Sequence, residues 1–200
     1  MSRTGTLSRW LALSLCLVLA SCGYNRIPTL EEQAKAKWAD VQNNYQRRAD
    51  LIPNLVATVQ GYAKQEKDVL TSVVEARAKA TQTRIDASQL TDPEKVKQFQ
   101  DAQNQLSGAL GRLIAISENY PDLKSNQNFL ALQSQLEGTE NRIAVARRDY
   151  IDAVQAFNSR VRSFPGNLVA NVVGFQPKPQ LPAEEGVTER PEIQFDFDKK

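Results

Sequence analysis

The side chains best suited to chemistry in this sequence are charged and amide groups in two short stretches far apart in the chain. They are Arg47, Arg48, Asp50 and Asn54 in the first stretch and Arg147, Arg148 and Asp149 in the second. Guanidinium groups can grip a carboxylate or a phosphate of a partner through paired hydrogen bonds. The same groups can instead form ion pairs between helices and so set their register, which is the commoner use of such clusters. Both interpretations remain open.

No set of residues indicates catalysis. The chain has no histidine, the side chain whose pKa best suits proton transfer near neutral pH and the commonest metal ligand. Glu137 and Glu140 could act as acid and base or hold a divalent cation, but a helical face rich in glutamate is usually only solvated. Residues 108–111 (GALG) lack the lysine of a phosphate loop and instead suit a close approach of two helices. We therefore predict no enzyme, and no metal, cofactor or small-molecule substrate.

The two cysteines, Cys16 and Cys22, lie near the N-terminus, where they build neither a disulfide framework nor a zinc site. Residues 1–21 combine a basic start, an apolar run over 10–20 and small residues at the end, which is the pattern of a secretory signal peptide. Residues 19–22 (LASC) resemble the lipobox of bacterial lipoproteins, in which the cysteine is acylated and becomes the first mature residue. We predict lipidation, for example by palmitate, at Cys22.

An uncleaved transmembrane helix is the alternative to a lipid anchor. The apolar run has 11 residues, whereas a membrane-spanning helix needs about 20. Several acyl chains on one cysteine anchor stably, because each buried methylene contributes ~0.8 kcal/mol. Either anchor places the rest of the chain outside the cytoplasm. In a cell with two membranes, Gly23 after the cysteine fits the periplasmic side of the outer membrane.

The charge balance argues against a nucleic-acid partner. Without Arg3 and Arg9 of the predicted signal peptide, the chain carries 23 basic and 23 acidic side chains. Nucleic-acid binders normally present a basic stripe to the phosphates. The partners we expect are the membrane, reached through the lipid anchor, and an envelope protein that the sequence does not identify.

The elements that position these groups are long helices, because apolar residues recur at steps of three and four. The pattern runs over 38–73, 96–116 and 129–164, the last resembling the seam of a coiled coil. We predict an all-α, up-and-down antiparallel bundle of three long helices, or four if the first is split at Pro53. A kink and a reversal at Pro53 are both open, because the apolar phase continues through the proline.

Start and stop signals divide the chain into segments. Residues 22–28 are expected to be a linker, 29–175 the bundle, and the proline-rich residues 176–200 a disordered tail with too little apolar surface to bury. The apolar segment 167–175 is expected to dock on the end of the bundle.

Local motifs add three expectations. Residues 29–32 (TLEE) and 91–94 (TDPE) have the form of capping boxes that start helices. Residues 119–122 (NYPD) should end the middle helix, because the residue before a proline disfavours helix. Tyrosines at seam positions, Tyr45, Tyr62 and Tyr150, are expected in the core.

Four separated motifs, in order, resemble the LemA family. The first is 47–56 (RRADLIPNLV) with 61–63 (GYA), and the others are 118–124 (ENYPDLK), 136–143 (LEGTENRI) and 146–150 (ARRDY), completed by 163–165 and 174–175. The resemblance covers roughly residues 24–175. It implies a helical bundle with an N-terminal membrane anchor, a body outside the cytoplasm, a relative on magnetosome membranes and no catalytic residue set. Many members keep a transmembrane helix where this sequence has its lipobox.

Taken together, these features favour a lipid-anchored, non-catalytic helical scaffold or adaptor of the bacterial cell envelope. One alternative is an accessory subunit of an envelope hydrolase or membrane protease. A freestanding enzyme is disfavoured, because histidine and a nucleophilic cysteine are both missing from the predicted mature chain. Another alternative is membrane shaping, which the magnetosome relative suggests and the neutral charge disfavours.

Overall fold

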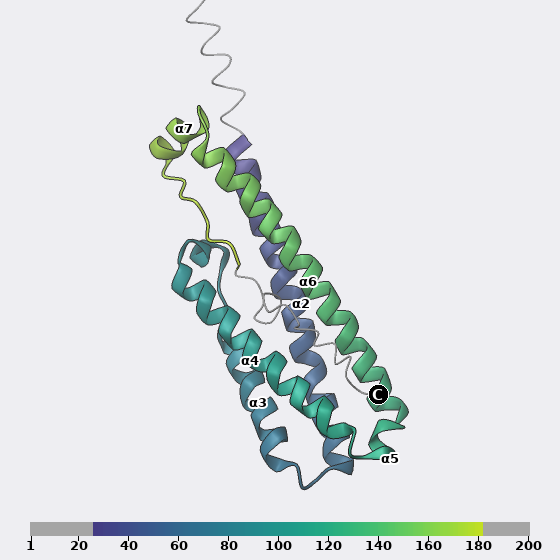
Figure 1. Cartoon of the computed structure of the whole chain (residues 1–200). Helices are drawn as coiled ribbons and strands as arrows, with labels where there is room; N and C mark the ends of the chain where they lie inside the picture. Colours follow the sequence, from purple (N-terminus) through teal and green to yellow (C-terminus); the bar gives the residue numbers. More distant parts are fainter. Residues whose placement is uncertain (1–25, 182–200) are drawn as a thin grey trace, which may run out of the picture.

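The computed structural model describes residues 26–181, whose regular elements are all helical (Figure 1). The long helices are α2 (Arg26–Tyr62), α3 (Lys67–Gln82), α4 (Pro93–Ser117) and α6 (Gln127–Arg162), and the short elements are the 3₁₀ helix η1 (Ala87–Thr91), α5 (Pro121–Lys124) and α7 (Gly166–Val173). Successive long helices run in opposite directions along one body (Figure 1). The predicted all-α, up-and-down bundle is confirmed.

Several predicted features lie outside the described residues. They are the signal peptide 1–21, the lipidation site Cys22 and residues 182–200 of the predicted tail. Within residues 26–181, no helix is both long enough and apolar enough to cross a membrane.

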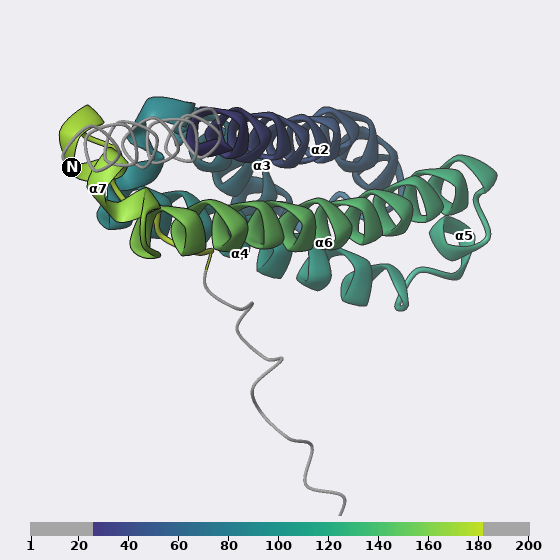
Figure 2. The ribbon, with the colours of Figure 1, turned by 90° about the horizontal axis from the view of Figure 1, so that it is seen from above.

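Helices α2 and α6 form the spine of the bundle. They lie side by side along their length (Figures 1 and 2), and with 37 and 36 residues each spans about 55 Å. The α3–α4 pair packs against this spine. In the middle of the core, the Trp38 ring lies 5.3 Å from that of Phe99 and 5.1 Å from that of Tyr150, so one aromatic cluster joins α2, α4 and α6.

Pro53 neither ends nor reverses the first helix, because α2 continues through it to Tyr62. A proline has no N–H, so the carbonyl four residues earlier loses its helical partner. That carbonyl belongs to Ala49, and the Arg77 side chain of α3 donates to it from Nε over 2.8 Å. The acceptor that Pro53 leaves free is therefore satisfied by the neighbouring helix, which also ties α3 to α2.

The chain reverses ten residues after Pro53. Ala63 donates the last helical hydrogen bond to Val59, a turn between Ala63 and Glu66 follows, and α3 starts at Lys67. Residues 26–181 therefore form four long helices, and the first division lies at 63–66. Of the two alternatives left open at Pro53, the reversal is excluded. The apolar phase gave no sign of the turn, because Leu70 and Val73 of α3 enter the same core cluster as residues of α2.

Neither predicted capping box forms. Helix α2 already includes Arg26, so Thr29 lies inside the helix and residues 26–28 are helical rather than linker. At α4 the cap is Asp92, whose carboxylate accepts from the backbone N–H groups of Glu94 and Lys95. The predicted cap Thr91 is instead the last residue of η1. Carboxylates are at least as good as hydroxyls at this position.

The C-terminal part of the described chain packs on the spine. The predicted docking of the apolar segment is confirmed, since Ala170 of α7 is buried with Phe157 and Val161. Residues 176–181, predicted as the start of a disordered tail, also pack. The Lys178 backbone exchanges two hydrogen bonds with the Asn158 side chain, of 2.8 and 2.7 Å, and Leu181 is buried. The hydrogen bonds between Lys178 and Asn158 and the burial of Leu181 thus hold residues 176–181 on the bundle, although their composition predicts a disordered tail.

Two smaller expectations hold only in part. Gly108 and Gly111 face open space rather than a neighbouring helix, while Ala109 between them is buried. Of the three seam tyrosines, Tyr45 and Tyr150 are in the core, but Tyr62 is 45% exposed at the end of α2. Tyr62 is the last residue of α2, where the neighbouring helices no longer cover it, so its apolar spacing does not bury it.

The contact between Arg77 and the Ala49 carbonyl predicts coupling between Pro53 and Arg77. Arg77→Ala should destabilise the protein by about 1–2 kcal/mol, because it leaves a carbonyl without a donor. In a Pro53→Ala background, the introduced alanine supplies its own N–H to that carbonyl, so the same change should cost less. Urea unfolding of the four proteins of this cycle should give a coupling of at least ~0.5 kcal/mol. Purely additive effects would contradict the proposed compensation.

Candidate functional site

Arg48 lies at the centre of the first sequence cluster and points into the bundle. Only 1% of the residue is exposed. Its guanidinium donates to the Ser107 hydroxyl over 2.7 Å, to the Gln103 amide oxygen over 2.6 Å and to the Glu140 carboxylate over 3.0 Å. It also lies over the Tyr45 ring, 5.0 Å from its centre. One side chain of α2 therefore holds α4 and α6 in place.

Arg147, from the second cluster, does the same from the opposite helix. It is 5% exposed and donates from α6 to the Tyr45 hydroxyl over 3.0 Å and to the Gln100 amide oxygen over 2.5 Å. Gln103 extends the network to α3, since its amide donates to the Ala80 carbonyl over 3.2 Å. The two buried arginines thus act between helices, as the register-setting interpretation expects.

The other members of the predicted cluster remain at the surface. Arg47, Asp50, Asn54 and Arg148 are exposed. Asp50 accepts a hydrogen bond from Gln46 over 2.7 Å. Asp149 pairs with Lys37 of α2 over 2.9 Å, and this hydrogen bond raises the pKa of Lys37 above its usual value. The two sequence clusters therefore divide into a buried pair, Arg48 and Arg147, and a set of side chains at the surface.

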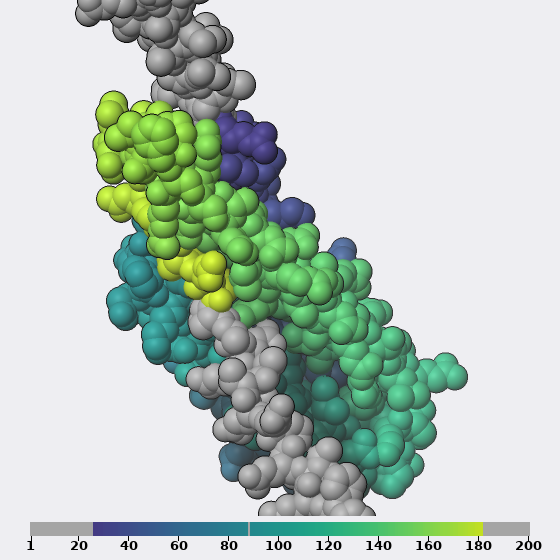
Figure 3. All heavy atoms as spheres, turned by 45° about the horizontal axis from the view of Figure 1, so that its top comes forward, coloured from purple at the N-terminus to yellow at the C-terminus, as the bar shows by residue number. Residues whose placement is uncertain are grey.

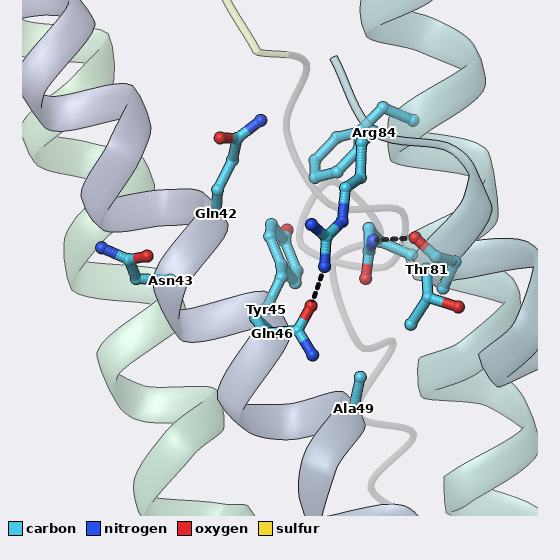
Figure 4. A pocket seen from close by; sticks show the side chains of 10 residues that line it. Gln42, Asn43, Tyr45, Gln46, Ala49, Thr81 and Arg84 are labelled. Carbon is cyan, nitrogen blue, oxygen red and sulfur yellow. Dashed lines mark hydrogen bonds between the residues drawn. The ribbon is translucent and has the colours of Figure 1, made fainter. Parts of the chain in front are cut away.

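A pocket of about 160 Å³ lies beside the buried network, between α2, α3 and α4 (Figure 4). Its walls are mainly amide and aromatic groups: Gln42, Asn43, Tyr45, Gln46, Ala49, Ala80, Thr81, Arg84, Phe99 and Gln103. Figure 4 shows Arg84 reaching across from the end of α3 to hydrogen-bond Gln46. Sequence reasoning missed Gln42, Gln46 and Arg84, because separate amides and one arginine carry no motif.

The pocket suits binding more than chemistry. At ~30 Å³ per water, its volume corresponds to about five water molecules or one protein side chain. Its lining holds neither a carboxylate nor a thiol that could transfer a proton or attack a substrate. The donors that it does hold, on Arg84 and the amides, suit an acidic or amide side chain.

Among the described residues, other titratable groups near the core are buried or engaged in hydrogen bonds. Burial raises the pKa of Tyr150 far above its ordinary value, so its phenol stays neutral. Glu140 is engaged by Arg48, and Glu137 accepts from Gln133 over 3.1 Å. Across residues 26–181, no three histidine, cysteine or acidic side chains gather as metal ligands would.

Comparisons with known proteins give one matching family and several relatives. The sequence profile of the LemA family matches residues 37–195. The chain is 27% identical over 169 residues to magnetosome protein MamQ 2 of Paramagnetospirillum magneticum and 26% identical to magnetosome protein MamQ of Magnetospirillum gryphiswaldense, covering in each case 76% of this chain and 62% of the relative. Protein LemA of Metamycoplasma hominis is 26% identical over 130 residues, which is 65% of this chain and 55% of that protein. The chain thus spans less than two thirds of the length of these relatives.

Adjacent arginines provide a matched test of the buried network. Arg48→Ala should lower the free energy of unfolding by about 2–4 kcal/mol, because it leaves a cavity and unpaired polar groups on α4 and α6. Arg47→Ala, one residue earlier and exposed, should change it by less than ~0.5 kcal/mol. Urea unfolding followed by circular dichroism measures both. Equal stability of the two variants would show that the network does not hold the helices.

Proposed function

The chain belongs to the LemA family, and from that premise we propose that it is a non-catalytic scaffold or adaptor, held at the cell envelope by a lipid on Cys22. The observation that carries the proposal is the division of the arginine cluster. Arg48 and Arg147 are engaged inside the bundle, so they make the frame rigid. Arg47, in contrast, does not lie inside the bundle and is exposed to solvent.

The surface set has the geometry of a recognition stripe. Arg47, Asp50 and Asn54 are exposed at spacings of three and four along α2, so they share one helix face. The pocket beside Gln46 lies on a neighbouring face of the same helix. A partner protein can therefore meet a guanidinium, a carboxylate and an amide on a frame that does not need to be ordered on binding, which lowers the entropic cost of association.

The anchor rests on the sequence and on the relatives. The LASC motif at residues 19–22 supplies a thiol in the context of a lipobox. Two of the relatives are named as magnetosome proteins, and a magnetosome location of a relative fits a membrane location for this chain. We propose that the bundle stands on the extracytoplasmic side of the membrane, which is the outer membrane in a cell that has two.

Cys22→Ala tests the anchor. We expect the wild-type chain in the membrane fraction, cut before Cys22 and carrying the mass of its acyl chains. The variant should lose the acyl mass and should remain unprocessed or leave the membrane. Fractionation followed by intact-mass spectrometry measures both properties. A wild-type chain that retains residues 1–21 would contradict the lipid anchor and favour an uncleaved helix.

The recognition stripe is tested by crosslinking in cells with identification by mass spectrometry. The double variant Arg47→Ala, Asn54→Ala should reduce the yield of a defined envelope partner at least tenfold while keeping wild-type stability. Arg112→Ala, an exposed arginine of α4, is the matched control and should change nothing.

The outcome also separates the candidate roles. A partner that is an envelope hydrolase or protease would make the chain its accessory subunit. A crosslinking profile that is the same for both variants and the wild type would contradict the stripe.

A further inference from the structure

Helix α7 carries an apolar face that the bundle does not cover. Leu168 and Val172, four residues apart on α7, are 57% and 87% exposed, and Val173 is 46% exposed. Phe164, two residues before the helix begins, is 79% exposed. Small residues make the docking contact instead, since Gly166 and Ala170 are the buried positions of α7. Four of the eight large exposed apolar side chains of residues 26–181 thus fall within ten consecutive residues. Such a concentration marks a contact surface.

This face lies at the end of the bundle where the N-terminal segment enters. Ala170 of α7 shares a small buried cluster with Ile27, near the start of α2. In Figure 3 the yellow-green atoms of α7 lie close to the purple atoms that begin α2. Cys22 precedes Ile27 by five residues, which span at most about 18 Å when extended. A lipid on Cys22 therefore holds the membrane surface close to the exposed face of α7.

The charges around this end suit a lipid surface. From residue 153 to residue 181 the chain contains Arg160, Arg162 and Lys178 and no acidic residue. The two glutamates near the start of α2, Glu31 and Glu32, are paired with Lys178 and Lys35. Lys178 is committed to Glu31 at 3.1 Å, but Arg162 is exposed beside the apolar face, and so is Arg26 at the start of α2. Apolar side chains flanked by basic ones are the composition of helices that lie in the membrane interface and contact anionic head groups.

We propose that α7 and Phe164, just before it, form a second membrane contact, in which Phe164, Leu168 and Val172 enter the interface of the bilayer to which Cys22 is anchored. The inference rests on the proposed lipid anchor. A protein partner fits the face less well, because a stable interface buries about 800 Å² on each side and four side chains do not supply that area. With α7 in the interface, the bundle has two attachments at one end and a defined orientation.

The test compares two engineered thiols in the full chain. Val172→Cys places a thiol on the proposed contact, and Leu130→Cys, at a 48% exposed position in the first turn of α6, is the control. Both are made in a Cys16→Ser background and expressed with the native Cys22. Their labelling by a polar maleimide is followed in broken envelopes, in detergent, and in vesicles of phosphatidylcholine with phosphatidylglycerol that hold less than one chain each.

In detergent Val172→Cys should label at least as fast as Leu130→Cys. In envelopes and in vesicles its rate should fall at least tenfold, while that of Leu130→Cys stays the same. Unchanged labelling of Val172→Cys in the vesicles overturns the proposal. Protection in envelopes but not in vesicles overturns it too, because a protein or a second copy would then cover the face.

The same samples distinguish failure of the anchor from failure of the contact. The membrane fraction and the mass of Cys22 report on the anchor, whatever the labelling shows. An acylated, membrane-bound chain whose Val172→Cys thiol is fully reactive refutes only the α7 contact. A chain without the acyl mass that stays out of the membrane refutes the anchor and, with it, the inference.

Discussion

The buried guanidinium of Arg48 is the constraint on which the arrangement of the long helices depends. A charge removed from water is tolerated only if its N–H groups find partners. The two terminal nitrogens of Arg48 find them on α4 and on α6 at the same time, whereas its buried Nε has no hydrogen-bond partner. Sliding either helix by one turn would move the acceptors by about 5.4 Å and leave the charge unpaired. Arg147 lies two turns beyond Glu140 on α6 and is buried in the same way, with partners on α2 and α4. The two buried arginines together therefore define one register of the helices.

The same need for polar partners explains other details of the bundle. Pro53 is tolerated inside α2 because the Arg77 side chain of α3 donates a hydrogen bond to the Ala49 carbonyl. The C-terminal segment stays on the spine because the backbone of Lys178 is paired with Asn158. Burial of apolar residues brings the helices together but does not depend on their exact alignment. Each of these hydrogen bonds, in contrast, forms only when its donor and acceptor are aligned. Polar contacts therefore select this bundle among the packings that the apolar faces would allow.

The two ends of the bundle also differ, so the proposed membrane attachment and the proposed recognition stripe lie in different parts of the molecule. Helix α7 and the start of α2 lie at one end, where the anchor and the apolar face of α7 would meet the membrane. Arg47 lies 21 residues along α2 from Arg26, or roughly 30 Å away. If the proposed attachments hold that end at a membrane, the recognition stripe would stand beyond the lipid head groups.

Local patterns suffice for the helical class and for the end of α4 before Pro121, because periodicity and proline geometry act over a few residues. The apolar composition of residues 167–175 indicated that this segment docks, but the tertiary contact decided that Ala170 makes the docking contact and Leu168 does not. Local patterns also identify the two arginine stretches. Which of two adjacent arginines enters the core is not a local property: Arg48 is buried because Gln103, Ser107 and Glu140, 55 to 92 residues away, are there to receive it. The turn at 63–66, the order of residues 176–181 and the pocket beside Gln46 likewise arise only when distant helices meet, since burial and polar pairing are properties of the packed chain.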